Sequence, residues 1–264
     1  MKRIILHWTA GRYKASKLDR KHYHYIVEDD GNIVKGDHDV EANRPPVKKG
    51  GYAAHTLRCN SNSIGISCAA MAGAKENEAE HKYPITAAQF NEMCELTASM
   101  CIEYDIPVNN KTVLSHAEVE KNLGKKQRGK WDIASLPHLS LKGADACGWA
   151  IRSRVQSIID VRKANANAMA QAKKAEKALT VVKDAAAKDR RSTTELTSMG
   201  GIAIGTIGMA EKAVDAAKRG NSLIDQIGEI GLSGIALVAL IGVGIYVIRE
   251  RRRKKAEAVD VLNA

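Results

Sequence analysis

Hydrophobic residues in the first 150 positions of this 264-residue chain occur in short runs that are typical of strands. Ile4, Ile5 and Leu6 form one such run, and "NSIGISCAAM" predicts a second strand that is buried. In "YHYIVEDDGNIVKG" two β-rich runs flank Asp30 and Gly31, a pair that favours a hairpin turn. "KTVLSH" predicts a further short strand that ends in a histidine.

An amphipathic helix is predicted from Thr86 onward, in "TAAQFNEMCELTASMCIEYDI". Thr86 and Gln89 have the spacing of a capping box, and apolar side chains then recur at helical intervals. The predicted buried face consists of Phe90, Met93, Cys94, Thr97, Cys101 and Tyr104. Because strands and helices are interleaved, we expect an α/β domain over residues 1–145.

The character of the chain changes after Trp149. Residues 150–192 lack Gly, Pro and aromatic residues and are rich in Ala and Lys, which favours a long helical spacer. Small and apolar residues there step by three and four, so both a solvated spacer and a weak coiled coil that forms an oligomer stay open. Residues 193–229 are predicted to be a Gly-containing apolar or amphipathic linker.

Residues 230–248, "IGLSGIALVALIGVGIYVI", carry no charge and are followed directly by "RERRRKK". As a helix this run is about 28 Å long, close to the thickness of a bilayer's hydrocarbon core. The sequence therefore predicts one transmembrane helix over 230–248 and a basic tail over 249–264. The positive-inside rule places this tail in the cytoplasm. A membrane-disrupting tail is the alternative.

Charge and cysteine content narrow the possible partners. The net charge of +11 arises mainly in residues 151–264, where 20 Lys and Arg stand against 12 Asp and Glu. This half has neither base-stacking aromatic residues nor a recognition motif, so anionic lipid or cell-wall polymer is expected rather than nucleic acid. The five cysteines are scattered without a CxxC pair, which argues against a disulfide framework or a zinc knuckle.

Three polar residues stand at positions that suit a metal centre. His7 ends the apolar run of "RIILHWTAG", and His116 ends "KTVLSH". Asp132 follows in "KWDI", after the Lys- and Gly-rich stretch "AEVEKNLGKKQRG". Two histidines at strand ends and one carboxylate could hold zinc with one position open. For a single histidine, a hydrogen-bonded structural role is the alternative.

Five motifs in order, "HWTAG", "YHYIVEDDGNIVKG", "HTLRCNSNSIGIS", "LSHAEV" and "RGKWDI", resemble the type 2 N-acetylmuramoyl-L-alanine amidases and peptidoglycan recognition proteins, most of all phage endolysins. The resemblance covers about residues 1–140. It implies a mixed β-sheet flanked by helices, a Zn²⁺ cleft, and hydrolysis of the amide between N-acetylmuramic acid and L-alanine in peptidoglycan. Some members of this family bind peptidoglycan without cutting it, and that is the alternative function.

The resemblance also implies roles for individual residues. His7 and His116 match the first two zinc ligands, and Asp132 matches the third in the members that use aspartate, although its distance from His116 is longer than in many members. Tyr23 and Lys130 match catalytic residues, Tyr23 for proton transfer and Lys130 for stabilising the oxyanion.

Further correspondences concern the cleft itself. Ser67 stands where other members place a glutamate. His55 matches a histidine at the cleft rim, and Asn62 is expected to shape the cleft as a second substrate-binding residue.

The predicted topology contains a conflict. A cytoplasmic basic tail places the amidase domain outside the host inner membrane, near its substrate. The apolar run of "MKRIILHW" is too short for a secretory signal peptide, so no cleavable export signal is expected. Either the C-terminal segment carries the domain across, or export depends on a holin or another membrane lesion. If the domain instead stays in the cytoplasm, the tail must cross the membrane, against the positive-inside rule.

Overall fold

The computed structural model describes residues 1–76, 78 and 80–188. The predicted linker, transmembrane helix and basic tail at 193–264 lie outside the described residues. In chain order the elements are β1 (Arg3–Trp8), α1 (Lys17–His22), β2 (Tyr25–Val27), β3 (Ile33–Lys35), η1 (Val40–Asn43), β4 (Ser63–Cys68), α2 (Ala87–Glu103), β5 (Val113–Ser115), α3 (His116–Leu123), β6 (Ser135–Leu136), η2 (Pro137–Leu139), β7 (Leu141–Lys142) and α4 (Ala144–Lys188).

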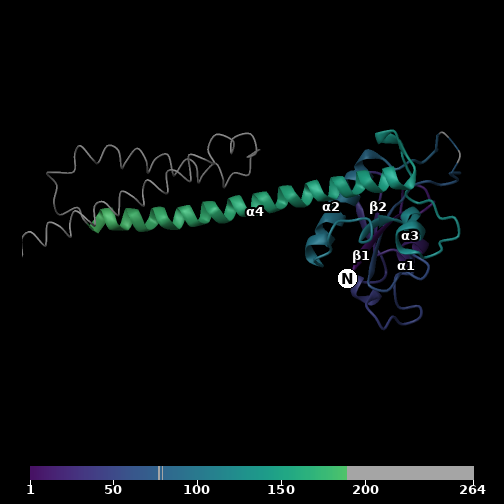
Figure 1. The fold of residues 1–264 in the computed structure, drawn as a ribbon, viewed down its shortest axis with the longest axis horizontal. Coiled ribbons are helices and arrows are strands. Elements are labelled where there is room, and N and C mark those ends of the chain that lie inside the picture. The colour runs from purple at the N-terminus through teal and green to yellow at the C-terminus, as the bar shows by residue number, and fades with distance from the viewer. Residues whose placement is uncertain (77, 79, 189–264) are drawn as a thin grey trace, which may run out of the picture. The chain divides into compact units, whose positions relative to one another are not determined.

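The central element is a five-stranded sheet with the order β3-β2-β4-β1-β5. β2, β4, β1 and β5 run parallel, whereas β3 is antiparallel to β2 as the outer arm of the predicted hairpin. The sheet is therefore mixed and flanked by helices, as the resemblance implied (Figure 1).

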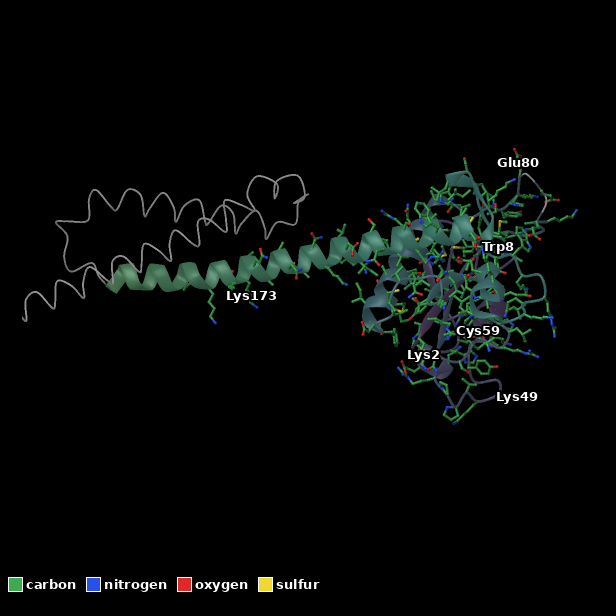
Figure 2. All side chains as sticks on the ribbon, viewed as in Figure 1. Lys2, Trp8, Lys49, Cys59, Glu80 and Lys173 are labelled. Carbon is green, nitrogen blue, oxygen red and sulfur yellow. The ribbon has the colours of Figure 1, made fainter. Side chains whose placement is uncertain are left out.

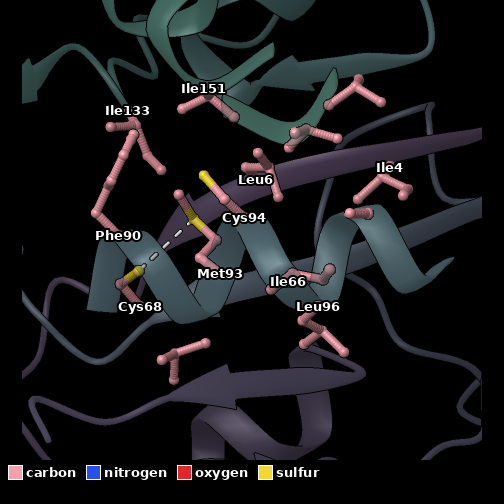
Figure 3. Close-up of a cluster of buried hydrophobic side chains, with 14 of the residues drawn as sticks. Ile4, Leu6, Ile66, Cys68, Phe90, Met93, Cys94, Leu96, Ile133 and Ile151 are labelled. Carbon is pink, nitrogen blue, oxygen red and sulfur yellow. Dashed lines mark hydrogen bonds between the residues drawn. The ribbon is translucent and has the colours of Figure 1, made fainter. Parts of the chain in front are cut away.

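One face of the sheet carries the main hydrophobic core. Helix α2 begins after Thr86 with the predicted capping box and lies over this face. In Figure 3 Met93 and Cys94 of α2 lie among Leu6, Ile66 and Cys68 from the strands, and the Cys68 thiol donates to Met93 Sδ at 3.7 Å. Every residue of β4 is buried, as expected for a central strand.

The opposite face has a much smaller apolar cluster, formed by Ile5, Cys59, Leu114 and Val119. Because side chains alternate between the faces of a strand, His7 of β1 lies on the same face as Ile5. Its register partner on β4 is Ser67, which is also buried. This face therefore combines a small core with polar side chains at the carboxyl ends of parallel strands, where α/β proteins commonly build sites.

The first turns of α4 belong to the main core. Their buried side chains share one helix face and are Cys147, Ile151, Val155, Ile158 and Ile159. Arg152 of this helix also donates to both carboxylate oxygens of the buried Glu118, at 2.9 and 3.0 Å. The compact unit accordingly runs from Met1 to Arg162 and extends beyond the predicted boundary at 145.

The remainder of α4 continues as helix to Lys188, within the stretch predicted as a helical spacer. Lys173 in this part is exposed (Figure 2). Figure 2 also labels Lys49 and Glu80, which lie in the long loops before β4 and before α2. No helix within residues 1–188 is long and apolar enough to cross a membrane.

We expect a chain that ends at residue 145 to lose cooperative folding, whereas a chain that ends at Arg162 keeps it. The shorter chain lacks four buried aliphatic side chains of α4 and leaves Glu118 buried without its arginine. Each loss costs on the order of 2–4 kcal/mol, which exceeds the stability of a typical domain in sum. Urea unfolding followed by circular dichroism measures the difference, and equal midpoints would contradict it.

Candidate metal centre

Strand pairing brings the two predicted histidine ligands together. β1 and β5 are parallel, and their register pairs Leu6 with Ser115, so the next residues, His7 and His116, lie side by side. Their rings meet edge to face with centroids 4.7 Å apart. One detail corrects the sequence analysis, because the strand ends at Ser115 and His116 is the first residue of α3.

Asp132 reaches the same place from a loop that is held on both sides. The ring of Trp131 packs against that of Trp8, with centroids 4.5 Å apart. Ile133 on the other side is fully buried in the main core. The backbone oxygen of Asp132 also accepts a hydrogen bond from the N–H of Ala117, in the first turn of α3, at 2.6 Å. The three contacts fix the carboxylate next to both imidazoles.

The three side chains converge on a single oxygen atom. Asp132 Oδ2 lies 2.9 Å from His7 Nδ1 and 3.2 Å from His116 Nδ1. All three residues are buried, and their potential ligand atoms lie within 4.8 Å of one another. The three residues proposed from sequence as metal ligands are therefore brought together by the fold.

Burial and hydrogen bonding set the charges of this cluster. Burial lowers the pKa of His7 to about 4, against the opposing effect of the Asp132 carboxylate. Burial alone would raise the pKa of Asp132, but the imidazoles of His116 and His7 beside the carboxylate outweigh this effect and hold the pKa at about 2. At neutral pH the centre thus contains an ionised carboxylate and a neutral His7, the forms that bind metals.

His55 lies directly behind His7, and this position corrects the expectation of a residue at the cleft rim. Its side chain is buried and its ring lies so close to Gly65 that a β-carbon there would clash with it. Its Nδ1 is 3.2 Å from His7 Nε2, and its Nε2 is 3.4 Å from the carbonyl oxygen of Ser63. His55 thus contacts a candidate ligand rather than a substrate position.

These contacts favour one of the two tautomers of His7. The Ser63 carbonyl can only accept, so His55 donates to it from Nε2 and keeps a lone pair on Nδ1. His55 Nδ1 then lies 2.8 Å from Thr56 Oγ1 and 3.2 Å from His7 Nε2, which itself lies 3.3 Å from that hydroxyl. A hydrogen on His7 Nε2 satisfies these partners and leaves Nδ1, which faces Asp132, for a metal. Burial also lowers the pKa of His55 well below its ordinary value, so the ring is neutral at neutral pH.

The donor set fits a zinc ion. With Nε2 of both rings directed at the groups behind them, the two Nδ1 atoms and Asp132 Oδ2 face one another and could be shared by one cation. Two imidazole nitrogens and one carboxylate oxygen are ligands that zinc accepts, with a fourth position left for water or substrate. His7, His116 and Asp132 would hold such an ion.

Tyr23 and Lys130 lie beside the cluster in different environments. Tyr23 caps the C-terminus of α1, and its ring centroid is 5.1 Å from that of His7. Burial and the charge of Asp132 raise the pKa of Tyr23 well above its usual value, so it remains a phenol that can donate a hydrogen bond. Lys130 is exposed, and its positive charge contributes to the lowered pKa of His7.

Asn62 is not part of this arrangement. It directly precedes β4, five residues before Ser67. The register of β1 with β4 pairs the next residue, Ser63, with Arg3, at the end of β1 away from His7. Its backbone N–H donates to Asn43 and its carbonyl accepts from Lys2, both at 2.8 Å. The expected contribution of Asn62 to the cleft is thus not supported, because the residue lies at the opposite edge of the sheet.

The mixed sheet and the buried His, His and Asp cluster define an α/β protein with a candidate metal centre. Residues 1–132, half of the chain, match the family described as N-acetylmuramoyl-L-alanine amidase. The chain belongs to this family, and the resemblance based on its five motifs is confirmed.

Two solved structures are similar to the chain at low identity. The first is the N-acetylmuramyl-L-alanine amidase AmiD from E. coli in complex with a substrate, at 20% identity and a TM-score of 0.32, with 44% of this chain and 48% of that chain covered. The second is the Staphylococcus aureus hydrolase AmiA with its ligand, at 14% identity and a TM-score of 0.41, covering 62% and 75%. The chain thus spans about half of the length of AmiD. No curated protein sequence matches it significantly.

Sequence reasoning missed the groups behind the ligands. Gln127 accepts from His116 Nε2 at 2.9 Å, and Thr56 Oγ1 lies 3.3 Å from His7 Nε2. Neither residue belongs to a recognisable motif. The one available signal was the long gap between His116 and Asp132, which includes Gln127. The helix α3 was also missed, although Ser115 and Glu118 have the spacing of a capping box.

We expect His24 to make the fold sensitive to acid. This buried ring accepts from the Gly65 N–H at 2.9 Å and donates to Asn43 Oδ1 at 3.1 Å, and burial lowers its pKa to about 4. The unfolded chain takes up this proton near pH 6.5, so stability falls on the order of 3 kcal/mol as the pH decreases from 6.5 to 4. The H24Q variant lacks this titration and should show a shallower decline.

Urea unfolding of the chelator-treated chain at a series of pH values measures how steeply the free energy of unfolding changes with pH in the wild type and in H24Q. H24Q should be less stable than the wild type at pH 7, because a flexible amide replaces a rigid ring that bonds to both Asn43 and Gly65. Identical slopes below pH 6.5 would show that His24 is not the titrating group.

Proposed function

We propose that the chain is a zinc-dependent N-acetylmuramoyl-L-alanine amidase that cleaves the amide between N-acetylmuramic acid and L-alanine in peptidoglycan. The observation that carries this proposal is the buried cluster of His7, His116 and Asp132 within the segment that matches the amidase family. A non-catalytic recognition module is the alternative, and the complete donor set speaks against it.

His7, His116 and Asp132 would hold the zinc ion through the atoms that already face one another. When bound, zinc supplies Lewis-acid chemistry, which activates water and polarises the amide carbonyl. Ser67 occupies the position at which other members have a glutamate, so no carboxylate stands there to move the proton. The other polar groups beside the cluster are Tyr23 and Lys130, which the resemblance matches to catalytic residues.

The two residues suit different roles. Lys130 is exposed and positively charged, and it can stabilise negative charge that develops on the carbonyl oxygen. Tyr23 remains protonated at neutral pH and lies against His7, so it orients water or donates a hydrogen bond rather than acting as a base. The neighbouring cations Lys125, Lys126 and Arg128 are exposed as well, which suits the carboxylates of peptide stems.

We expect the full chain to release free L-alanine amino groups from purified peptidoglycan, and a chelator to abolish this release. The H116A variant should lose activity and bind less zinc. The K130A variant should retain zinc but lose about 10²–10³-fold in rate, the typical cost of removing one group that stabilises the oxyanion. Amine labelling followed by chromatography measures the released groups.

The matched control is K111A, which removes an exposed cation that precedes β5, at the end of this strand away from His116. It should keep the rate of the wild type within a few fold. A chain that binds zinc and sediments with peptidoglycan but releases no amino groups would instead be a recognition module. The catalytic roles proposed for Lys130 and Tyr23 would then be wrong.

We further propose that the protein is tethered to the host inner membrane through residues 230–248. The support is the uncharged run and the basic residues that follow it. The positive-inside rule alone places the basic tail in the cytoplasm and the amidase domain on the other side of the membrane. Action as a phage endolysin, with or without a holin, stays a prediction.

The full chain should remain with lipid vesicles after washes in high salt, whereas a chain that ends at residue 229 is released. Insertion of an apolar helix resists salt, because it does not depend on surface charge. Vesicle flotation with immunodetection measures both. Release of the full chain by salt would indicate that only the basic tail binds the surface.

A further inference from the structure

Gln127 is a buried residue in an otherwise exposed and basic loop. Its neighbours Lys125, Lys126 and Arg128 are exposed, whereas only 3% of Gln127 is accessible. The loop belongs to the long gap between the candidate ligands His116 and Asp132. A polar side chain that is buried among charged neighbours needs a set of hydrogen bonds to hold it there.

The hydrogen bonds of Gln127 fix the orientation of its amide. The side-chain nitrogen lies 3.0 Å from the carbonyl oxygen of Leu57 and 2.8 Å from that of Lys125. Carbonyl oxygens only accept, so the NH₂ group must face them with its two hydrogens. The amide oxygen therefore points the other way, toward His116 Nε2 at 2.9 Å.

The orientation of the amide in turn fixes the proton of His116. An amide oxygen cannot donate, so the ring must carry its hydrogen on Nε2 and donate it to Gln127. The other nitrogen, Nδ1, keeps its lone pair and faces Asp132 Oδ2 at 3.2 Å. Two backbone carbonyls thus determine, through one glutamine, which nitrogen of a candidate ligand is free.

We propose that Gln127 is a positioning residue that locks His116 in the Nε2–H tautomer and so dedicates Nδ1 to the metal. This inference rests on the proposed zinc-dependent function. It also gives a role to the long segment between His116 and Asp132, because that segment contains Gln127. The backbone N–H of Gln127 also donates to Glu120 Oε2 of α3 at 2.9 Å, so the loop is tied to the helix that carries His116. Partners of this kind behind a ligand typically change metal affinity by about 10–100-fold.

A purely structural role is the competing explanation, since Gln127 also holds the loop to Leu57 and Lys125. Two substitutions separate the roles. Q127L removes both the acceptor for His116 and the donors to the carbonyls. Q127E keeps an acceptor for His116 but replaces the donating NH₂ group with an oxygen.

The experiment measures the zinc affinity of the full chain by competition with a chromophoric chelator. If Gln127 fixes the tautomer of His116, Q127L should lose about 10–100-fold in zinc affinity. Q127E should then bind zinc at least as tightly as the wild type. A structural role predicts that Q127E binds zinc as weakly as Q127L or more weakly, because it loses the same two backbone contacts.

Gln89 provides the matched control. It is also fully buried, and its side-chain nitrogen donates to the carbonyl oxygens of Val27 and Ala69, but its oxygen accepts from the N–H of Thr86. Q89L should lower the unfolding midpoint in urea and leave zinc affinity within about twofold of the wild type, since Gln89 has no bond to a ligand.

Nitrogen-15 NMR of the zinc-loaded protein adds a readout that loop stability does not supply. The wild type and Q127E should coordinate through Nδ1 of His116, and Q127L should lose this uniform pattern. Zinc affinity of Q127L equal to that of the wild type, or coordination through Nε2 of His116 in the wild type, would overturn the proposed role of Gln127. Neither result would contradict the proposed zinc-dependent function. A wild-type chain that binds no zinc would overturn the proposed function as well.

Discussion

The structure of the site depends on one carboxylate oxygen that faces two imidazole nitrogens. Asp132 Oδ2 lies within 3.2 Å of Nδ1 of both His7 and His116, in a place from which solvent is largely excluded. Such an arrangement of lone pairs is unfavourable without a cation or protons between them. The fold holds it because each residue is fixed independently, His7 by β1, His116 by the start of α3, and Asp132 by the contacts of its neighbours.

A buried polar centre of this kind requires partners for every remaining hydrogen-bonding atom. Behind His7 the chain of contacts runs through His55 to the carbonyl oxygen of Ser63, and behind His116 it runs through Gln127 to the carbonyls of Leu57 and Lys125. Both chains end on backbone acceptors, which cannot change their role. The tautomer of His116 is therefore set by the backbone, whereas the hydroxyl of Thr56 shares in setting that of His7, because it contacts both His55 Nδ1 and His7 Nε2.

The strands, α2 and the three candidate ligands could be predicted from sequence, because each has a local signal. Alternating or continuous apolar runs define the strands, and Thr86 with Gln89 defines the start of α2. His7, His116 and Asp132 belong to ordered motifs. The partners behind them have no such signal, since Gln127 resembles any polar residue in a basic loop.

The structure differs from the sequence-based predictions at other residues because their positions depend on contacts between residues that are far apart in the sequence. His55 was placed at the rim, but it is buried against Gly65, a residue whose missing side chain makes room for the ring. Asn62 seemed close to the cleft by motif, but the parallel register puts it at the opposite edge. The start of α4 was assigned to a spacer because it is rich in Ala and Lys, and its buried face emerges only when it packs on α2 and the sheet.

The charges around the centre favour the chemistry proposed for it. The donor set has a single negative charge, that of Asp132, because His7 is neutral and the groups behind both histidines are uncharged. The nearby carboxylate of Glu118 is paired with Arg152. A divalent cation held there would therefore keep a net positive charge, and the exposed Lys130 adds another. A site with this balance stabilises negative charge that develops on a carbonyl oxygen, whereas a second anionic ligand or an anionic partner behind His116 would weaken this effect.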